Sequence, residues 1–328
     1  MFGALIDALA SLDRFADPLA WVVVAAFVGG ALLERYDREA GRYLTVGAWV
    51  AFALFWLSLV YHFAFVQKSI IEGLGTLVAV PASLYTGYLL YRGRDSLFVL
   101  SRAIAGMGLV FMPFQTIPFL REWLIETVAL QTKFLMGLLG YHPDLVSGAL
   151  VPGADHYAYQ NTFHFLHENF RGAGQNYEVF YTIKIACTGI GSMAIFGGLI
   201  AAVRAPLRRK ARALSLSIPI IYVLNLVRNV FIGLSFGEMK MQFFAGAVST
   251  LFAFDLQAEP AKVSYYLADR IVSQSASVVV LVAITWLVVR ELPEVLTIVE
   301  DVLFVFTGSE YDLRRALDLP ADPSYSNN

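Results

Sequence analysis

The sequence predicts an all-α, polytopic membrane protein with about seven transmembrane helices plus interfacial helices. Of its 328 residues, 58% are hydrophobic and only 15% are charged, whereas an ordinary soluble domain carries about 25% charged residues. Several apolar stretches reach the roughly 20 residues that a helix needs to cross the hydrocarbon core. Because open sheets and irregular backbone cannot face lipid, stretches of this length indicate helices.

The predicted spans follow one another along most of the chain. Their ranges are 19–33, 43–66, 70–91, 97–119, 178–203, 213–236 and 264–289. Arginine and lysine are concentrated in alternate connections, near 35–42, 92–102, 204–212 and 290–315. Short loops rich in these residues face the cytoplasm. We therefore expect the amino terminus outside the cell and the carboxyl terminus inside.

Three segments outside the predicted spans are amphipathic. Residues 1–14 place apolar side chains on one helical face, which is typical of an interfacial helix. The apolar pattern of 121–141 is interrupted by charges and is predicted to lie in the outer interface. Residues 295–306 are too short to span and are expected along the inner face.

These spans define the expected domain organisation. Residues 1–290 form a transmembrane catalytic domain with an outer loop at 142–177, and residues 291–328 form a cytoplasmic amphipathic segment followed by a loose tail. A long ordered loop is often functional. The net charge of −2 gives no indication of a nucleic-acid partner.

The outer loop includes the histidines His156, His164 and His167. If the stretch HFLHEN is helical, His164 and His167 share a helical face. A zinc site needs three or four ligands in place, so a metal-dependent membrane hydrolase is one alternative for the function. The other interpretation of the loop is a solvated, aromatic-rich lid.

The strongest candidate site centres on Cys187, the only cysteine, within the apolar segment YTIKIACTGIG. Two arginines, Arg228 and Arg270, lie inside later apolar runs, where a charged side chain is costly and therefore suggests function. At 1.5 Å per residue the three lie about 13, 12 and 9 Å below the outer ends of their predicted helices. They are expected in one shallow outer layer.

Each of these residues also has a purely structural interpretation. Cys187 could be a packed thiol among small residues. Arg228 and Arg270 could extend toward the interface or pair with a carboxylate such as Asp269 or Glu238. A multi-helix transporter would also place arginines in a cavity, although transporters usually show repeats or broken helices near the midplane, and none is visible here.

The chemistry of the three residues favours acyl transfer. Nearby cations lower the pKa of a thiol and favour the nucleophilic thiolate. The guanidinium fork of arginine can hold a thiolate and then the oxyanion of a tetrahedral intermediate. No histidine or carboxylate is expected in the layer as a general base, and Tyr181 or Tyr266 could protonate the leaving amine.

The residues resemble a known family, the exosortase and archaeosortase group of polytopic transpeptidases. The resemblance rests on three motifs: ACTGIGS around Cys187, NLVRNVFIG around Arg228 and ADRIVSQS around Arg270, separated by 41 and 42 positions. Exosortases carry histidine at the third position. The archaeosortases carry arginine there, as this chain does, and it resembles them most.

The resemblance implies a cysteine protease and transpeptidase, with no cofactor and no metal. Such enzymes recognise surface proteins, such as the S-layer glycoprotein, through a carboxyl-terminal signal made of a Pro-Gly-Phe motif, a transmembrane helix and a basic end. They remove the helix and join the new terminus to a membrane lipid. The implied catalytic residues are Cys187 as nucleophile, Arg228 and Arg270. The implied location is the cell membrane, with the active site near the extracellular face.

Overall fold

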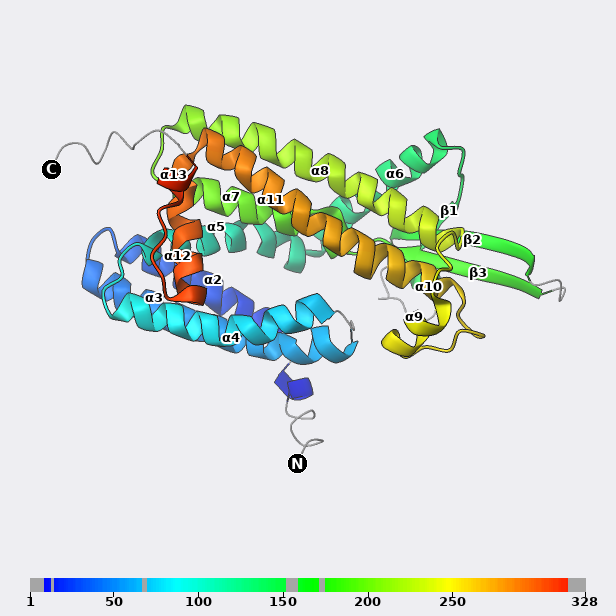
Figure 1. Ribbon diagram of the computed structural model, residues 1–328, viewed down its shortest axis with the longest axis horizontal. Helices are drawn as coiled ribbons and strands as arrows, with labels where there is room; N and C mark the ends of the chain where they lie inside the picture. Colours follow the sequence, from blue (N-terminus) through cyan, green and yellow to red (C-terminus); the bar gives the residue numbers. More distant parts are fainter. Residues whose placement is uncertain (1–8, 13–14, 67–69, 152–158, 171–174, 318–328) are drawn as a thin grey trace. The chain divides into compact units, whose positions relative to one another are not determined.

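The structure is a computed structural model that describes residues 9–12, 15–66, 70–151, 159–170 and 175–317. It is mostly helical (Figure 1), which confirms the predicted fold class. The chain divides into two compact units. The first unit contains Met1–Met112, Ala194–Ile218 and Ile284–Asn328, and the second contains Pro113–Met193 and Pro219–Ala283.

Four long helices supply most of the first unit. They are α2 (Ala16–Leu33), α3 (Arg38–Tyr61), α4 (Ile70–Tyr91) and α5 (Leu97–Thr116), the last of which continues into the second unit. The side chain of Asp37 caps α3 by accepting hydrogen bonds from the backbone amides of Glu39 and Ala40. Phe27 and Trp49 are buried where α2 meets α3, with their rings edge to face 5.3 Å apart.

Small residues let α5 approach α7 (Ile190–Ala202) closely inside the first unit. A methyl group added at Gly198 would lie only 2.4 Å from the carbonyl oxygen of Ala103. Such close approach of helix backbones is typical of membrane proteins, where small residues allow van der Waals packing between helices. The apolar run from 190 to 202 is therefore used for packing, although it is too short to cross a bilayer by itself.

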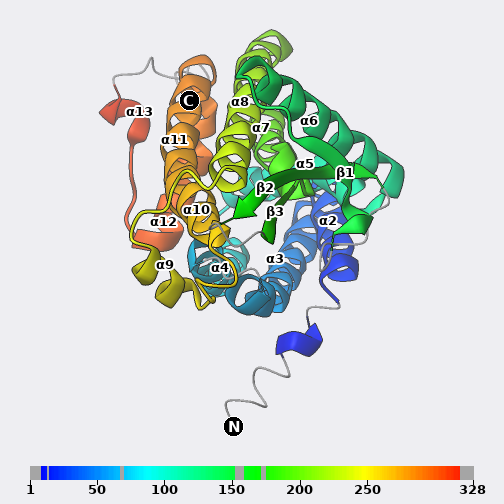
Figure 2. The same cartoon turned by 90° about the vertical axis from the view of Figure 1, so that its right-hand side faces the viewer.

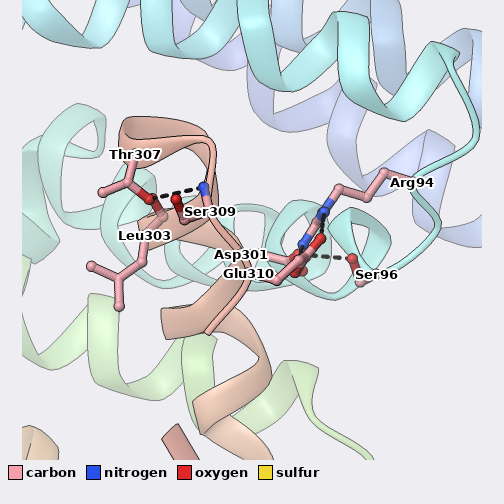
Figure 3. A network of polar contacts seen from close by, with 7 residues as sticks. All are labelled: Arg94, Ser96, Asp301, Leu303, Thr307, Ser309 and Glu310. Atoms are coloured by element: carbon pink, nitrogen blue, oxygen red, sulfur yellow. Dashed lines mark hydrogen bonds and ion pairs between the residues drawn. The ribbon is translucent and has the colours of Figure 1, made fainter. Parts of the chain in front are cut away.

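The carboxyl-terminal segment of the first unit is held by Arg94 (Figure 3). This segment contains α12 (Leu296–Thr307) and α13 (Leu313–Ala316). Arg94 lies 2.9 Å from buried Asp301 and 2.6 Å from exposed Glu310, and Ser96 donates a further hydrogen bond to Asp301. The hydrogen bond from Arg94 lowers the pKa of the Glu310 carboxyl. Helix α12 is thus held beside the connection between α4 and α5.

The second unit contains α6 (Pro118–Leu138) and a small antiparallel sheet. The strands are β1 (Asp144–Ser147), β2 (Gln160–Phe170) and β3 (Gln175–Thr182), in the order β1-β2-β3 (Figure 2). In the β2–β3 register Phe163 pairs with Tyr181. The side chain of Asn161 donates to the carbonyl of Ile183, which continues the pairing past the end of β3. The sheet positions the chain that follows β3.

Two long helical stretches complete the second unit. Helix α8 (Leu207–Gly237) begins in the first unit and ends in the second. The other stretch starts with α10 (Ala261–Tyr265), continues as a π-helical segment, Tyr266–Ser273, and ends with α11 (Gln274–Glu291). Between the two stretches lies the short helix α9 (Ala245–Phe252). Single π-helical turns inside α-helices are frequent at functional sites.

Six of the described helical stretches are long and apolar enough to cross a membrane. They are Ala16–Leu33, Arg38–Val66, Glu72–Tyr91, Leu97–Thr116, Leu207–Gly237 and Ala261–Glu291. The sequence predicts about seven spans, and the range that differs is 178–203. The prediction of one continuous helix there is wrong. That range contains the end of β3, a 3-10 turn and α7. Its first residues form a strand because their backbone groups make hydrogen bonds with β2 instead of within a helix.

The predicted amphipathic segments have different outcomes. Most of 1–14 and the end of the tail, 318–328, lie outside the described residues. The segment predicted at 121–141 is largely helical as part of α6, and 295–306 corresponds closely to α12. The depth of each segment in a membrane stays a prediction.

Candidate active site

Cys187 lies on the 3-10 turn Ile185–Thr188, between β3 and α7, and not within a helix as expected. The turn is closed by a 2.8 Å hydrogen bond from the backbone amide of Cys187 to the carbonyl of Lys184. The next residue but one, Gly189, has a φ of 78°, a conformation that glycine adopts without steric cost. The motif CTGIG therefore encodes a tight turn that presents a half-buried thiol.

Two asparagines of α8 hold this turn through one backbone atom. Asn225 and Asn229 each donate from Nδ2 to the carbonyl oxygen of Cys187, at 2.6 and 2.7 Å. They are four positions apart, so they share a face of α8, and a carbonyl oxygen has two lone pairs for two donors. A methyl group added at Gly189 would lie 3.1 Å from the side chain of Asn225. Glycine at this position therefore also favours the close approach of the turn to α8.

Arg228 and Arg270 meet through a shared carboxylate. Arg228 donates from Nη2 to Oδ1 of Asp269 at 2.9 Å, and Arg270 Nε lies 3.4 Å from Oδ2 of the same residue. Arg228 comes from α8, whereas Asp269 and Arg270 are neighbours in the π-helical segment. One acidic side chain therefore connects the two arginines across two helical stretches of the second unit.

The charges of this cluster are largely removed from solvent. The side chains of Asp269 and Arg270 are 11% and 12% exposed, and that of Arg228 is 29% exposed. Nε of Arg228 is buried and has no hydrogen-bond partner among the described residues. An unsatisfied buried donor costs about 1–3 kcal/mol, so this N–H is available to an acceptor that enters the site.

Two tyrosines line the cluster. Tyr181 on β3 points its hydroxyl toward Oδ1 of Asn229 at 3.5 Å, and the hydroxyl of Tyr265 lies 3.4 Å from Nη2 of Arg270. Tyr266, which the sequence suggested as a proton donor, stacks instead on Phe252 with ring centroids 4.1 Å apart. Tyr265, and not its neighbour, is the tyrosine that contacts the arginine.

The electrostatics of the thiol differ from the expectation. Cys187 lies outside the six candidate spans, and burial raises the pKa of its thiol above the ordinary value. A hydrogen bond with the backbone of Lys184 and the positive charge of Arg228 act in the opposite direction, but they do not outweigh burial. The predicted lowering of the thiol pKa is therefore wrong in direction, because the cost of desolvating a thiolate exceeds the attraction of the cations.

The histidines of the outer loop do not form the arrangement that a helix would give. His164 and His167 lie on strand β2, where residues three apart point to opposite faces. Nε2 of His164 is 3.5 Å from Glu178, and Nε2 of His167 is 2.7 Å from the carbonyl oxygen of Gly237. His156 lies outside the described residues. Within the part of the chain that the structure describes, no group of three or more histidine, cysteine, aspartate or glutamate residues could hold a metal ion.

The structure thus adds residues that the sequence did not single out for the site. Asn225 and Asn229 flank Arg228 in the motif NLVRN, and Asp269 directly precedes Arg270. The signal available in the sequence was the four-residue spacing of the asparagines on an apolar helix. The sequence predicts Asp269 only as a structural partner of an arginine, and the structure contains that pair with Arg228.

Comparison with known proteins defines the class. Residues 14–256 match the profile of a family described as transmembrane exosortase. The chain therefore belongs to the transmembrane exosortase family, which confirms the expected resemblance. The matched range contains Cys187 and Arg228 and ends before Asp269 and Arg270.

Two individual relatives are similar to the chain over most of its length. The chain is 50% identical over 313 residues to archaeosortase A of Haloferax volcanii, an alignment that covers 92% of this chain and 98% of the relative. It is 43% identical over 316 residues to archaeosortase A of Natronomonas pharaonis, covering 92% of this chain and 93% of the relative. No solved structure matches the chain.

Proposed function

We propose that this protein is a membrane-embedded cysteine transpeptidase of the archaeosortase A type. It cleaves surface proteins at a carboxyl-terminal signal that combines a Pro-Gly-Phe motif, a transmembrane helix and a basic end, and it transfers the new terminus to a membrane lipid. The observation that carries the proposal is the position of Cys187, the sole thiol, on a turn that is fixed to α8 by Asn225 and Asn229, the two asparagines on either side of Arg228. The likeness to archaeosortase A over most of the chain supports the same function.

In the first step the Cys187 sulfur attacks the scissile carbonyl carbon. The thiol loses its proton, the C–N bond breaks through a tetrahedral intermediate, and the leaving amine takes up one proton, so that a thioester and a free amine result. The unpartnered Nε of Arg228 is a suitable donor to the oxyanion of the intermediate. A lipid hydroxyl or other nucleophile then attacks the thioester and restores the thiol.

Arg270 completes the positive environment of the reaction. Its guanidinium is fixed by Asp269 on one side and contacts the Tyr265 hydroxyl on the other. In this position it orients the substrate or adds to the stabilisation of the oxyanion. The catalytic residues of the proposal are therefore Cys187, Arg228 and Arg270.

The partners and location follow from the same proposal. Residues 1–290 form the catalytic domain in the cell membrane, and the reaction takes place near the extracellular face. Substrates are surface proteins such as the S-layer glycoprotein, and the acyl acceptor is a membrane lipid. The excess of arginine in alternate connections between the predicted spans supports this orientation.

The test is the Cys187→Ala variant in cells that make a surface protein with such a signal. Processing should be lost, because no other thiol exists in the chain. Mass spectrometry of the carboxyl terminus of the surface protein measures both cleavage and lipid attachment. Ser249→Ala on α9 is the matched control, since it also removes one side-chain heteroatom, and it should process normally. A well-expressed Cys187→Ala protein that still processes its substrate would disprove the proposal.

A further inference from the structure

Asp269 has no chemical step in the reaction proposed above, yet it occupies the centre of the charged cluster. One carboxylate oxygen accepts from Arg228 and the other lies against Arg270. The residue is only 8% exposed. A buried charge is retained at considerable cost unless its partners and hydrogen bonds compensate for it, so this carboxylate is tied closely to the two arginines.

The two arginines would not hold their positions without it. Arginine side chains are long and have many rotamers, and two neighbouring cations repel each other in a medium of low dielectric constant. A carboxylate with one oxygen for each guanidinium restricts both side chains and offsets one positive charge. Asp269 and Arg270 are consecutive residues of the π-helical segment and form an ion pair with each other.

We propose that Asp269 is a positioning residue that holds the guanidinium groups of Arg228 and Arg270 side by side for the reaction at Cys187. The inference rests on the proposed function and extends it to a residue beyond the part of the chain that the family profile matches. Both carboxylate oxygens already face guanidinium nitrogens. Asp269 therefore acts through the arginines and not as a general base.

Turnover of three variants provides the first part of the test. Asp269→Asn keeps the shape but removes the charge and one acceptor, and we expect processing of a signal-bearing peptide to fall about 10- to 100-fold, as for small misplacements of catalytic groups. Asp269→Glu restores the carboxylate and should recover part of the loss. Glu34→Gln is the matched control, because Glu34 is 14% exposed and pairs with Arg102 at 2.9 Å. It should process at the parent rate.

Alkylation of the sole cysteine provides a second readout that needs no substrate. The charged and titratable groups that interact with the thiol include Tyr181 on β3, Lys184 beside its own turn, Arg228 on α8, Tyr265 of α10 and Asp269 in the π-helical segment. In Asp269→Asn one negative charge is removed while the cations remain. We therefore expect alkylation by iodoacetamide at pH 7.5 to become several-fold faster while processing becomes slower.

Asp269→Glu separates positioning from a general loss of structure, because unfolding would expose the buried thiol and speed its alkylation in either variant, whereas a folded Asp269→Glu protein keeps the carboxylate charge and a parent-like alkylation rate. Processing at the parent rate in Asp269→Asn would overturn the inference, and so would slow processing together with unchanged or slower alkylation. If Asp269→Asn does not fold, Asp269→Glu decides the question: reduced turnover with a parent-like alkylation profile supports positioning, and parent-like turnover overturns it. Failure of the parent protein to process the peptide would contradict the proposed function instead, and the alkylation result would still be readable.

Discussion

Asn229 donates a 2.7 Å hydrogen bond from its side-chain amide to the carbonyl oxygen of Cys187. The bond joins residues 42 positions apart, and Asn229 is only 1% exposed. It fixes the backbone from which the thiol projects relative to the helix that carries Arg228. The turn that carries the nucleophile is therefore tied to the helix that carries Arg228 through the Cys187 backbone and asparagine side chains.

The first prediction concerns the asparagine clamp, by which we mean the two hydrogen bonds from Asn225 and Asn229 to the Cys187 carbonyl oxygen. Asn229→Ala should slow processing about 10-fold, because the Cys187 carbonyl keeps only Asn225 as a side-chain donor and the turn can shift. The Asn225→Ala, Asn229→Ala double variant should lose more than either single variant. The measurement is the rate of cleavage of a signal-bearing peptide in detergent or vesicles.

Tyr222→Phe is the control for the clamp. It removes another hydrogen bond of α8, the one from the Tyr222 hydroxyl to Gln131 on α6, and leaves the Cys187 turn intact. Normal turnover is expected in this variant. Equal losses in Tyr222→Phe and Asn229→Ala would indicate that any weakening of α8 impairs the enzyme, and the clamp would then have no specific role.

The second prediction concerns Arg228. Arg228→Lys keeps a positive charge but loses the planar fork, which here uses Nη2 for Asp269 and leaves Nε open. We expect turnover to fall at least about 100-fold, as when one oxyanion donor is removed. The substrate concentration for half-maximal rate should change much less, because the lost interaction exists mainly in the transition state.

Near-normal turnover in Arg228→Lys would reduce the role of Arg228 to a general positive potential. The kinetics of this variant should be compared with those of Arg102→Lys, which changes an arginine that pairs with Glu34 in the first unit. Arg102→Lys should retain turnover, since its guanidinium belongs to a structural ion pair.

The third prediction uses pH to define the role of Arg270. The imidazole in Arg270→His has an ordinary pKa of about 6.5 and is mostly neutral at pH 8. If the site needs a permanent cation, the variant should be about 10- to 100-fold slower than the parent at pH 8 and should approach the parent rate as the pH falls toward 6. If the position transfers protons, the variant should instead work well near neutrality and lose activity on acidification.

The pH dependence of Cys187 must be separated from that of the imidazole. Burial raises the pKa of the thiol, so the thiolate fraction, and with it the parent rate, should keep rising with pH above about 8.5. The informative quantity is the ratio of variant to parent rates at each pH, because the thiol titration largely cancels in it. A ratio of one at every pH would remove Arg270 from the site.

Local patterns in the sequence determined the class of protein and most of its predicted spans. Apolar runs, the distribution of arginine and the low share of charged residues identified the membrane class and the six helices that are long enough to span. They did so because hydrophobic burial and the cost of charge in lipid depend mainly on composition and local spacing. The two arginines within apolar runs were identified for the same reason.

Contacts between distant residues decided the rest. The segment before Cys187 is strand and turn, not helix, because Phe163 of β2 pairs with Tyr181 of β3, and nothing within an apolar run reveals such a partner. The direction of the thiol pKa depended on how deeply the turn is enclosed, which cations alone did not indicate. The link between Arg228 and Asp269 joins positions 41 apart on two helical stretches. Only packing of those stretches determines that one carboxylate serves both arginines.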